Sequence, residues 1–145
     1  MKKIIAALLL GVVLATHAAA YDLNKVSEKT AEELAVLMHP ETRHLADEVV
    51  ALCKEHGVSA EFIAAIMRYE RRPDLCNWFG WSENGLIRFD SDEDCLQSVI
   101  PKIKANYLTP GGMYYNGATV CGVSMYYNNS EFWRTAIFEE MERMQ

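Results

Sequence analysis

A carboxylic acid on the apolar face of a predicted helix is the feature of this sequence with the clearest chemical potential. The segment 60–72 is predicted to be helical, and at about 100° per residue Glu70 falls inside the arc that runs from Phe62 to Met67. The other charged side chains of the segment point to the opposite side, namely Glu61, Arg68, Arg71 and Arg72. Glu70 is therefore expected to lie among apolar groups.

An acid in this position is suited to donating a proton. Desolvation among apolar groups and the negative end of the helix dipole both favour the protonated form of a carboxyl group, and nearby arginines oppose them. A glycoside hydrolase needs such an acid to protonate the leaving sugar oxygen. The alternative interpretation is a partly exposed Glu70 at a fraying helix end, paired with Arg71 or Arg72.

Aromatic residues are concentrated between positions 77 and 127. Sugar rings have apolar faces and polar rims, so clefts that bind them are lined with aromatic side chains and amides. Part of this set is expected in the core, namely Phe89, Tyr107 and at least one of Tyr126 and Tyr127. The residues in turn-rich segments are expected to border a groove, namely Trp81, Tyr114, Tyr115 and Asn116.

The elements that must position these residues are mostly helices. Apolar periodicity and capping residues predict helices over 26–38, from Pro40 to a stop at Gly57, and from Ser59 through 60–72. Further helices are predicted from a capping box at Ser91, with a kink at Pro101, then over 118–127, and from Ser130. A turn at 83–85 predicts one small β-hairpin that returns through 86–89. The fold class is therefore mainly α (α+β), with one small β-hairpin lobe.

The first twenty residues have the pattern of a removable export signal. Lys2 and Lys3 precede an apolar run, and the segment ends in an Ala-x-Ala site at Ala18 and Ala20. We therefore expect a signal peptide over 1–20 and one domain over 21–145 in the periplasm or outside the cell, with no membrane span after signal removal. A retained membrane anchor is the alternative interpretation. The chain carries a formal net charge of −6, which argues against nucleic acid or anionic membranes as partners.

The cysteines are expected to be structural. The sequence holds 4 of them, Cys53, Cys76, Cys95 and Cys121, and an even count in an exported chain predicts two disulfides in one of three pairings. Neither a C-x-x-C nor an H-E-x-x-H motif is present, so no metal site and no cofactor are expected.

A series of short motifs in order along the chain resembles the glucosaminidase family of peptidoglycan hydrolases, whose domain is lysozyme-like. The matching pieces are 39–40, 43–45, 57–66 followed by Glu70, 77–81, 89–91 with 94–95, 106–108 and 114–117, and then Tyr127 and Trp133. Members of this family cut the bond that follows N-acetylglucosamine in the bacterial wall.

The resemblance implies roles for individual residues. Glu70 matches the catalytic glutamate of the family, which acts as the general acid. Asn77 and Phe79 match a segment that closes the floor of the cleft, and the 114–117 stretch, with Tyr114, Tyr115 and Asn116, matches its far wall. Together with Trp81, these are the expected substrate-binding residues, and Tyr115 is a second catalytic candidate.

The sequence leaves the second catalytic group open. Candidate carboxylates are Asp74, Glu83, Asp90 and Asp92, and the acetamido group of the substrate, oriented by Tyr115, could serve instead. One departure from the family matters here, since only the six residues 71–76 separate Glu70 from Asn77, where the family has a longer stretch.

The hypothesis that follows is a secreted, monomeric β-N-acetylglucosaminidase that acts on peptidoglycan glycan strands. The shortened 71–76 loop motivates an alternative, a glycan-binding module of the same fold that has lost its activity. A structural or inhibitory exported protein is a third interpretation.

Overall fold

The computed structural model describes residues 21–145, so the predicted signal peptide lies outside the described residues. These residues form the helices α2 (Ala31–Leu37), α3 (Ala46–His56), α4 (Ala60–Glu70), α5 (Asp92–Ile103), α6 (Val120–Tyr127) and α7 (Glu131–Arg143). Three single turns complete the set, namely the 3₁₀ turns η1 (Arg43–Leu45) and η2 (Pro73–Leu75) and the π-helical turn η3 (Lys104–Leu108). The prediction of a mainly helical fold is confirmed.

Helix starts lie where a hydroxyl side chain can accept the first free backbone N–H group. Ser59 accepts from the amide of Phe62, at 3.2 Å. Ser91 and Ser130 do the same for α5 and α7, at 3.0 and 2.9 Å. Such caps satisfy N–H groups that have no partner inside the helix. α2 begins later than predicted because Thr30 and Glu33 form a capping box at its start.

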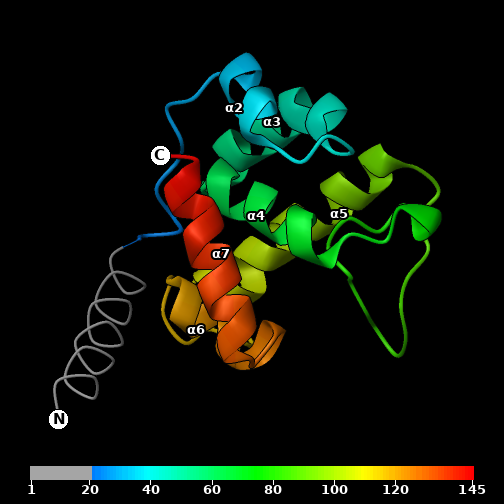
Figure 1. Ribbon diagram of the computed structural model, residues 1–145. Coiled ribbons are helices and arrows are strands. Elements are labelled where there is room, and N and C mark those ends of the chain that lie inside the picture. The colour runs from blue at the N-terminus through cyan, green and yellow to red at the C-terminus, as the bar shows by residue number, and fades with distance from the viewer. Residues whose placement is uncertain (1–20) are drawn as a thin grey trace, which may run out of the picture.

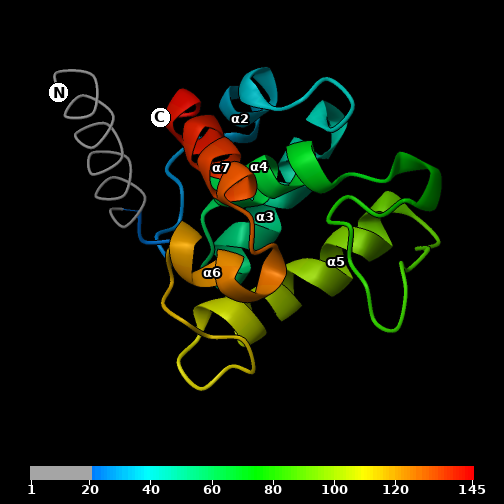
Figure 2. The ribbon, with the colours of Figure 1, turned by 60° about the horizontal axis from the view of Figure 1, so that its bottom comes forward.

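Helix α4 forms the centre of the core. Its side chains Phe62, Ile63, Ile66 and Met67 are fully buried. α4 packs against α3 and α7, while α3 also packs against α2 and α5 (Figures 1 and 2). A helix buried on nearly all sides holds its last residue, Glu70, in a fixed place relative to its neighbours.

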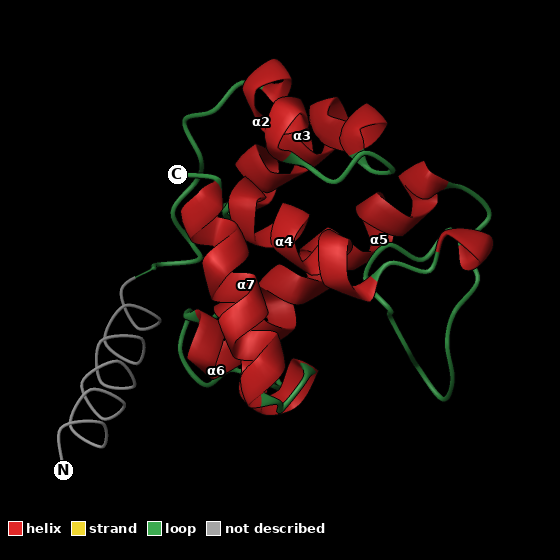
Figure 3. Ribbon diagram, in the orientation of Figure 1, coloured by secondary structure: helices red, strands yellow, loops and turns green. Residues whose placement is uncertain are grey.

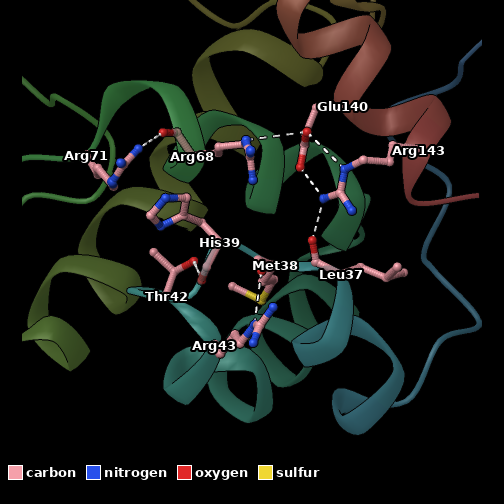
Figure 4. Close-up of polar contacts among 9 residues, drawn as sticks. All are labelled: Leu37, Met38, His39, Thr42, Arg43, Arg68, Arg71, Glu140 and Arg143. Atoms are coloured by element: carbon pink, nitrogen blue, oxygen red, sulfur yellow. Dashed lines mark hydrogen bonds and ion pairs between the residues drawn. The ribbon is translucent and has the colours of Figure 1, made fainter.

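A buried carboxylate joins α7 to α4 and α2. Glu140 pairs with Arg68 of α4 at 3.5 Å and accepts hydrogen bonds from Arg143, which also donates to the carbonyl of Leu37 (Figure 4). Burial of a charge is tolerated where it is paired and hydrogen-bonded in this way. In the same region burial lowers the pKa of His39, and the nearby arginines act in the same direction.

The predicted β-hairpin is not formed. Among the described residues there are two isolated β-bridges, Arg72 with Asn77 and Ser82 with Leu86, and no strand (Figure 3). The turn at 83–85 is present and the Ile87 amide donates to the Trp81 carbonyl at 3.1 Å, but the rest of the returning arm bonds elsewhere. The carbonyl of Ile87 accepts from the Asn77 side chain, and the amide of Phe89 donates to Leu75. These contacts replace the ladder that a hairpin needs.

All four cysteines are free in the structure, and no pair lies at disulfide distance. The two expected disulfides are therefore not present. Cys53 and Cys95 are buried in the core, Cys76 is half-buried and Cys121 is exposed. Within residues 21–145, we find no helix of the length and apolar character that a bilayer crossing requires.

Candidate functional site

The site is built around Glu70, the last residue of α4, whose side chain is half-buried. Its Oε1 atom accepts a hydrogen bond from the Asn128 amide at 3.1 Å. Its Oε2 atom and its backbone carbonyl both lie against Gly80, where an added Cβ atom would be 3.1 and 3.2 Å away from them. Glu70 is thus neither deep in the core nor extended into solvent.

The segment around Gly80 owes its position to Asn77 and Tyr127. Asn77 is fully buried, and its side chain bonds to the backbone of Trp81 in both directions, at 2.8 and 2.9 Å. The Tyr127 hydroxyl donates to the carbonyl of Phe79 at 2.6 Å. Gly80 adopts a φ of +59°, a conformation that favours glycine, and this lets the chain approach Glu70 closely.

A cavity of about 550 Å³ is bordered by Gly80. Its lining includes Gly80, Trp81, Glu83, Tyr107, Tyr114 and Tyr127. The ring centroid of Tyr107 lies 5.1 Å from that of Tyr114 and 5.5 Å from that of Tyr127, so the aromatic side chains form a connected wall. Glu70 is not itself among the lining residues, but it lies against Gly80, which is one of them.

Two tyrosines of the cavity wall have raised pKa values. Burial raises the pKa of Tyr107 to about 12, with Tyr114 acting in the same direction. Burial also raises the pKa of Tyr127 well above its ordinary value, and the neighbouring Glu70 adds to this. Both phenols therefore remain neutral hydrogen-bond donors near neutral pH.

Glu83 is the anionic group of the cavity. Hydrogen bonds from Lys102 at 2.7 Å and Trp81 at 3.1 Å lower the pKa of Glu83 below its ordinary value. A carboxyl group with a lowered pKa stays ionised across the neutral range. The cavity thus combines neutral aromatic side chains with one exposed carboxylate, which is paired with Lys102.

The predicted site residues fall into three groups. Trp81 and Tyr114 line the cavity. Asn77 and Phe79 are buried beneath it, so they shape the wall rather than face the cavity. Tyr115 and Asn116 are exposed on the loop between η3 and α6 and are not among the lining residues.

Of the four carboxylates that the sequence offers as a second catalytic group, Glu83 alone lines this cavity. Asp92 accepts from Trp78 at 2.9 Å and contacts His44 at 3.1 Å, and Asp74 and Asp90 are exposed. Glu83 is exposed as well, with 53% of its side chain accessible, so its place in the cavity wall is what distinguishes it.

One contributor escaped the sequence reasoning. Asn128, which bonds to Glu70, lies 58 residues further along the chain, in an Asn-x-Ser stretch that is better explained as a loop with a helix cap. Asn106, which lines the cavity, belongs to the 106–108 piece of the motif resemblance, which assigns it no role. A tertiary contact of this kind leaves no local signal in a single sequence.

Comparison with known proteins adds nothing to these observations, since no family model, no curated protein and no solved structure matches the chain. Within residues 21–145, no group of three or more His, Cys, Asp or Glu side chains is arranged to hold a metal ion.

Proposed function

We propose that this protein is an exported glycoside hydrolase that cleaves the β-1,4 bond after N-acetylglucosamine in peptidoglycan. The observation that carries the proposal is the position of Glu70, half-buried at the end of α4 and adjoining an aromatic cavity that contains a second carboxylate. Glycoside hydrolases generally use two carboxyl groups on either side of the bond that they cleave, and Glu70 and Glu83 are the pair in this proposal. The motif resemblance of the sequence supports the same class.

In this mechanism the two carboxyl groups have different tasks. Glu70 protonates the glycosidic oxygen as the bond to the sugar breaks, which requires it to enter the reaction as the acid. Glu83, whose pKa is lowered by Lys102 and Trp81, remains the anion that stabilises the positive charge or activates water. An acetamido group of the substrate, oriented by Tyr115, is the other route to the second role.

Aromatic side chains bind the glycan strand in this proposal. Trp81 and Tyr114 line the cavity, and the exposed Tyr126 continues the wall, with its ring centroid 5.8 Å from that of Tyr114. Sugar rings stack on such faces while their hydroxyl groups bond to the polar rim. The protein acts as a monomer and uses no cofactor or metal ion in this scheme.

A second candidate, a glycan-binding module without activity, is favoured by one observation. Glu70 is not among the residues that line the cavity, and one of its carboxyl oxygens is occupied by Asn128. Such a protein would bind wall fragments in the aromatic cavity and release them unchanged.

The substitution Glu70→Gln tests the choice between the two. It keeps the shape of the side chain and the contact with Gly80 but removes the transferable proton. We expect it to abolish the release of reducing ends from purified cell wall, while the exposed Glu139→Gln, on α7, retains the parental rate. Equal rates for Glu70→Gln and the parent would refute the assignment of the acid, and binding without cleavage by the parent would select the second candidate.

A further inference from the structure

The side chain that holds Glu70 comes from the linker between α6 and α7. Asn128 donates from Nδ2 to Glu70 Oε1 at 3.1 Å. Both ends of the linker are fixed, because Tyr127 bonds to the carbonyl of Phe79 at 2.6 Å and Ser130 caps α7 at 2.9 Å. The chain on both sides of Asn128 is therefore anchored.

The two oxygens of Glu70 have different surroundings. Oε1 faces the Asn128 amide, whereas Oε2 lies beside Gly80, which lines the cavity. An amide N–H group can only donate, and the oxygen of a carboxyl group that carries the proton is the weaker acceptor. The contact with Asn128 thus places the proton of the neutral acid on Oε2.

We propose that Asn128 is a positioning residue that turns Glu70 so that Oε2 delivers the proton to the substrate. The inference rests on the proposed function. In the reaction, the proton passes from Oε2 to the glycosidic oxygen as the bond from that oxygen to the anomeric carbon breaks, and the electron pair stays on the oxygen. A water molecule adds to the anomeric carbon and loses its proton to a base, for which Glu83 is the candidate.

Among the groups around Glu70, the one that bonds to its carboxyl group is a neutral donor. Tyr127, from α6, is a neutral phenol whose pKa is raised by burial and by the neighbouring Glu70. Arg71, its neighbour on the chain, is directed elsewhere, because its guanidinium pairs with Glu41 at 2.7 Å and donates to the carbonyl of Arg68. Asn128 orients the carboxyl group without adding a charge that would hold it as the anion.

Two substitutions at Asn128 and one at its neighbour test the inference. Asn128→Ala removes the donor, and Asn128→Asp replaces it with an acceptor of the same shape. Asn129→Asp is the matched control, because the side chain of Asn129 contacts Arg134 rather than Glu70. Each variant is assayed for kcat and KM on purified cell wall across pH, with circular dichroism to confirm folding.

We expect both Asn128 variants to lose roughly tenfold in kcat with KM nearly unchanged, the loss typical of one hydrogen bond to a charged or reacting group. In Asn128→Asp the fall of activity at high pH moves to higher pH, because a second carboxylate beside Glu70 favours its protonated form. Asn129→Asp keeps the parental rate and profile. A merely structural role for Asn128 would lower stability and leave the kcat of folded Asn128→Ala at the parental value.

Parental kcat and pH profile in both Asn128 variants would overturn the inference and leave the proposed function standing. A parent that does not cleave cell wall would overturn the proposed function. In that case the carbon-13 resonance of the Glu70 carboxyl group still decides whether Asn128 acts on it. We expect this resonance to titrate at a higher pH in Asn128→Asp than in Asn129→Asp, and identical titrations would overturn the inference.

Discussion

Replacing Gly80 with alanine is expected to disturb Glu70 as well as the backbone. Gly80 has a φ of +59°, where an L residue other than glycine costs about 1–2 kcal/mol. The added Cβ atom would also meet Glu70 Oε2 at 3.1 Å and the Glu70 carbonyl at 3.2 Å. Overpacking of this kind costs about 1 kcal/mol or more, and the carboxyl group is the part that can move. We therefore expect a total loss of about 2–3 kcal/mol.

Gly57 provides a matched control for the backbone effect. Its φ of +67° is nearly the same, but the nearest atom to an added Cβ is Lys104 Nζ at 3.7 Å, an ordinary contact. Gly57→Ala should lose only the backbone cost of about 1–2 kcal/mol. The difference between the two variants measures the contact of Gly80 with Glu70.

The assays are thermal unfolding and cleavage of purified cell wall. For a domain of this size, about 1 kcal/mol corresponds to roughly 4 °C in Tm, so Gly80→Ala should melt several degrees below Gly57→Ala. A shift of a few tenths of an ångström in a catalytic group should lower kcat roughly tenfold, and Gly57→Ala should retain the parental rate. Equal Tm values together with parental activity in Gly80→Ala would refute the close approach of Gly80 to Glu70.

Two further predictions concern charge and thiol chemistry. Lys102→Met removes a donor that lowers the pKa of Glu83, so Glu83 should lose its charge at a higher pH, nearer its ordinary pKa of 4.5, and the acidic limb of the activity profile should move upward. An acidic limb at the same pH in Lys102→Met and in the parent would contradict the role of Glu83. Iodoacetamide should label the exposed Cys121 in the folded protein and leave the buried Cys53 unmodified, with four thiols labelled after unfolding. Intact-mass spectra that show no labelling of the unfolded protein would contradict the free thiols.

Local signals in the sequence account for much of the helical frame. Ser59, Ser91 and Ser130 are capping residues at the predicted starts of their helices, and each makes the expected bond. Gly57 ends α3 in the left-handed conformation that glycine favours. These features depend on residues within one turn of one another, which is why a single sequence reveals them.

Features that depend on distant residues were not predictable in the same way. The hairpin prediction was wrong because Asn77, ten residues before Ile87, takes the carbonyl that the second arm of the hairpin would need. The polar and apolar pattern on α4 placed Glu70 on the buried side, but its contact with Asn128 joins residues 58 positions apart, which no local pattern predicts. Which aromatic residues belong to the core and which line the cavity also depends on tertiary packing, such as that of Tyr107 against Tyr127.

The central claim is that Glu70 is an acid serving a sugar-binding cavity. Mass spectrometry of the fragments released from purified peptidoglycan tests it most directly, because it reports both cleavage and the sugar at each new end. The account predicts fragments that end in reducing N-acetylglucosamine with the parent protein and none with Glu70→Gln. Fragments ending in a different sugar, or an identical set from both proteins, would contradict it.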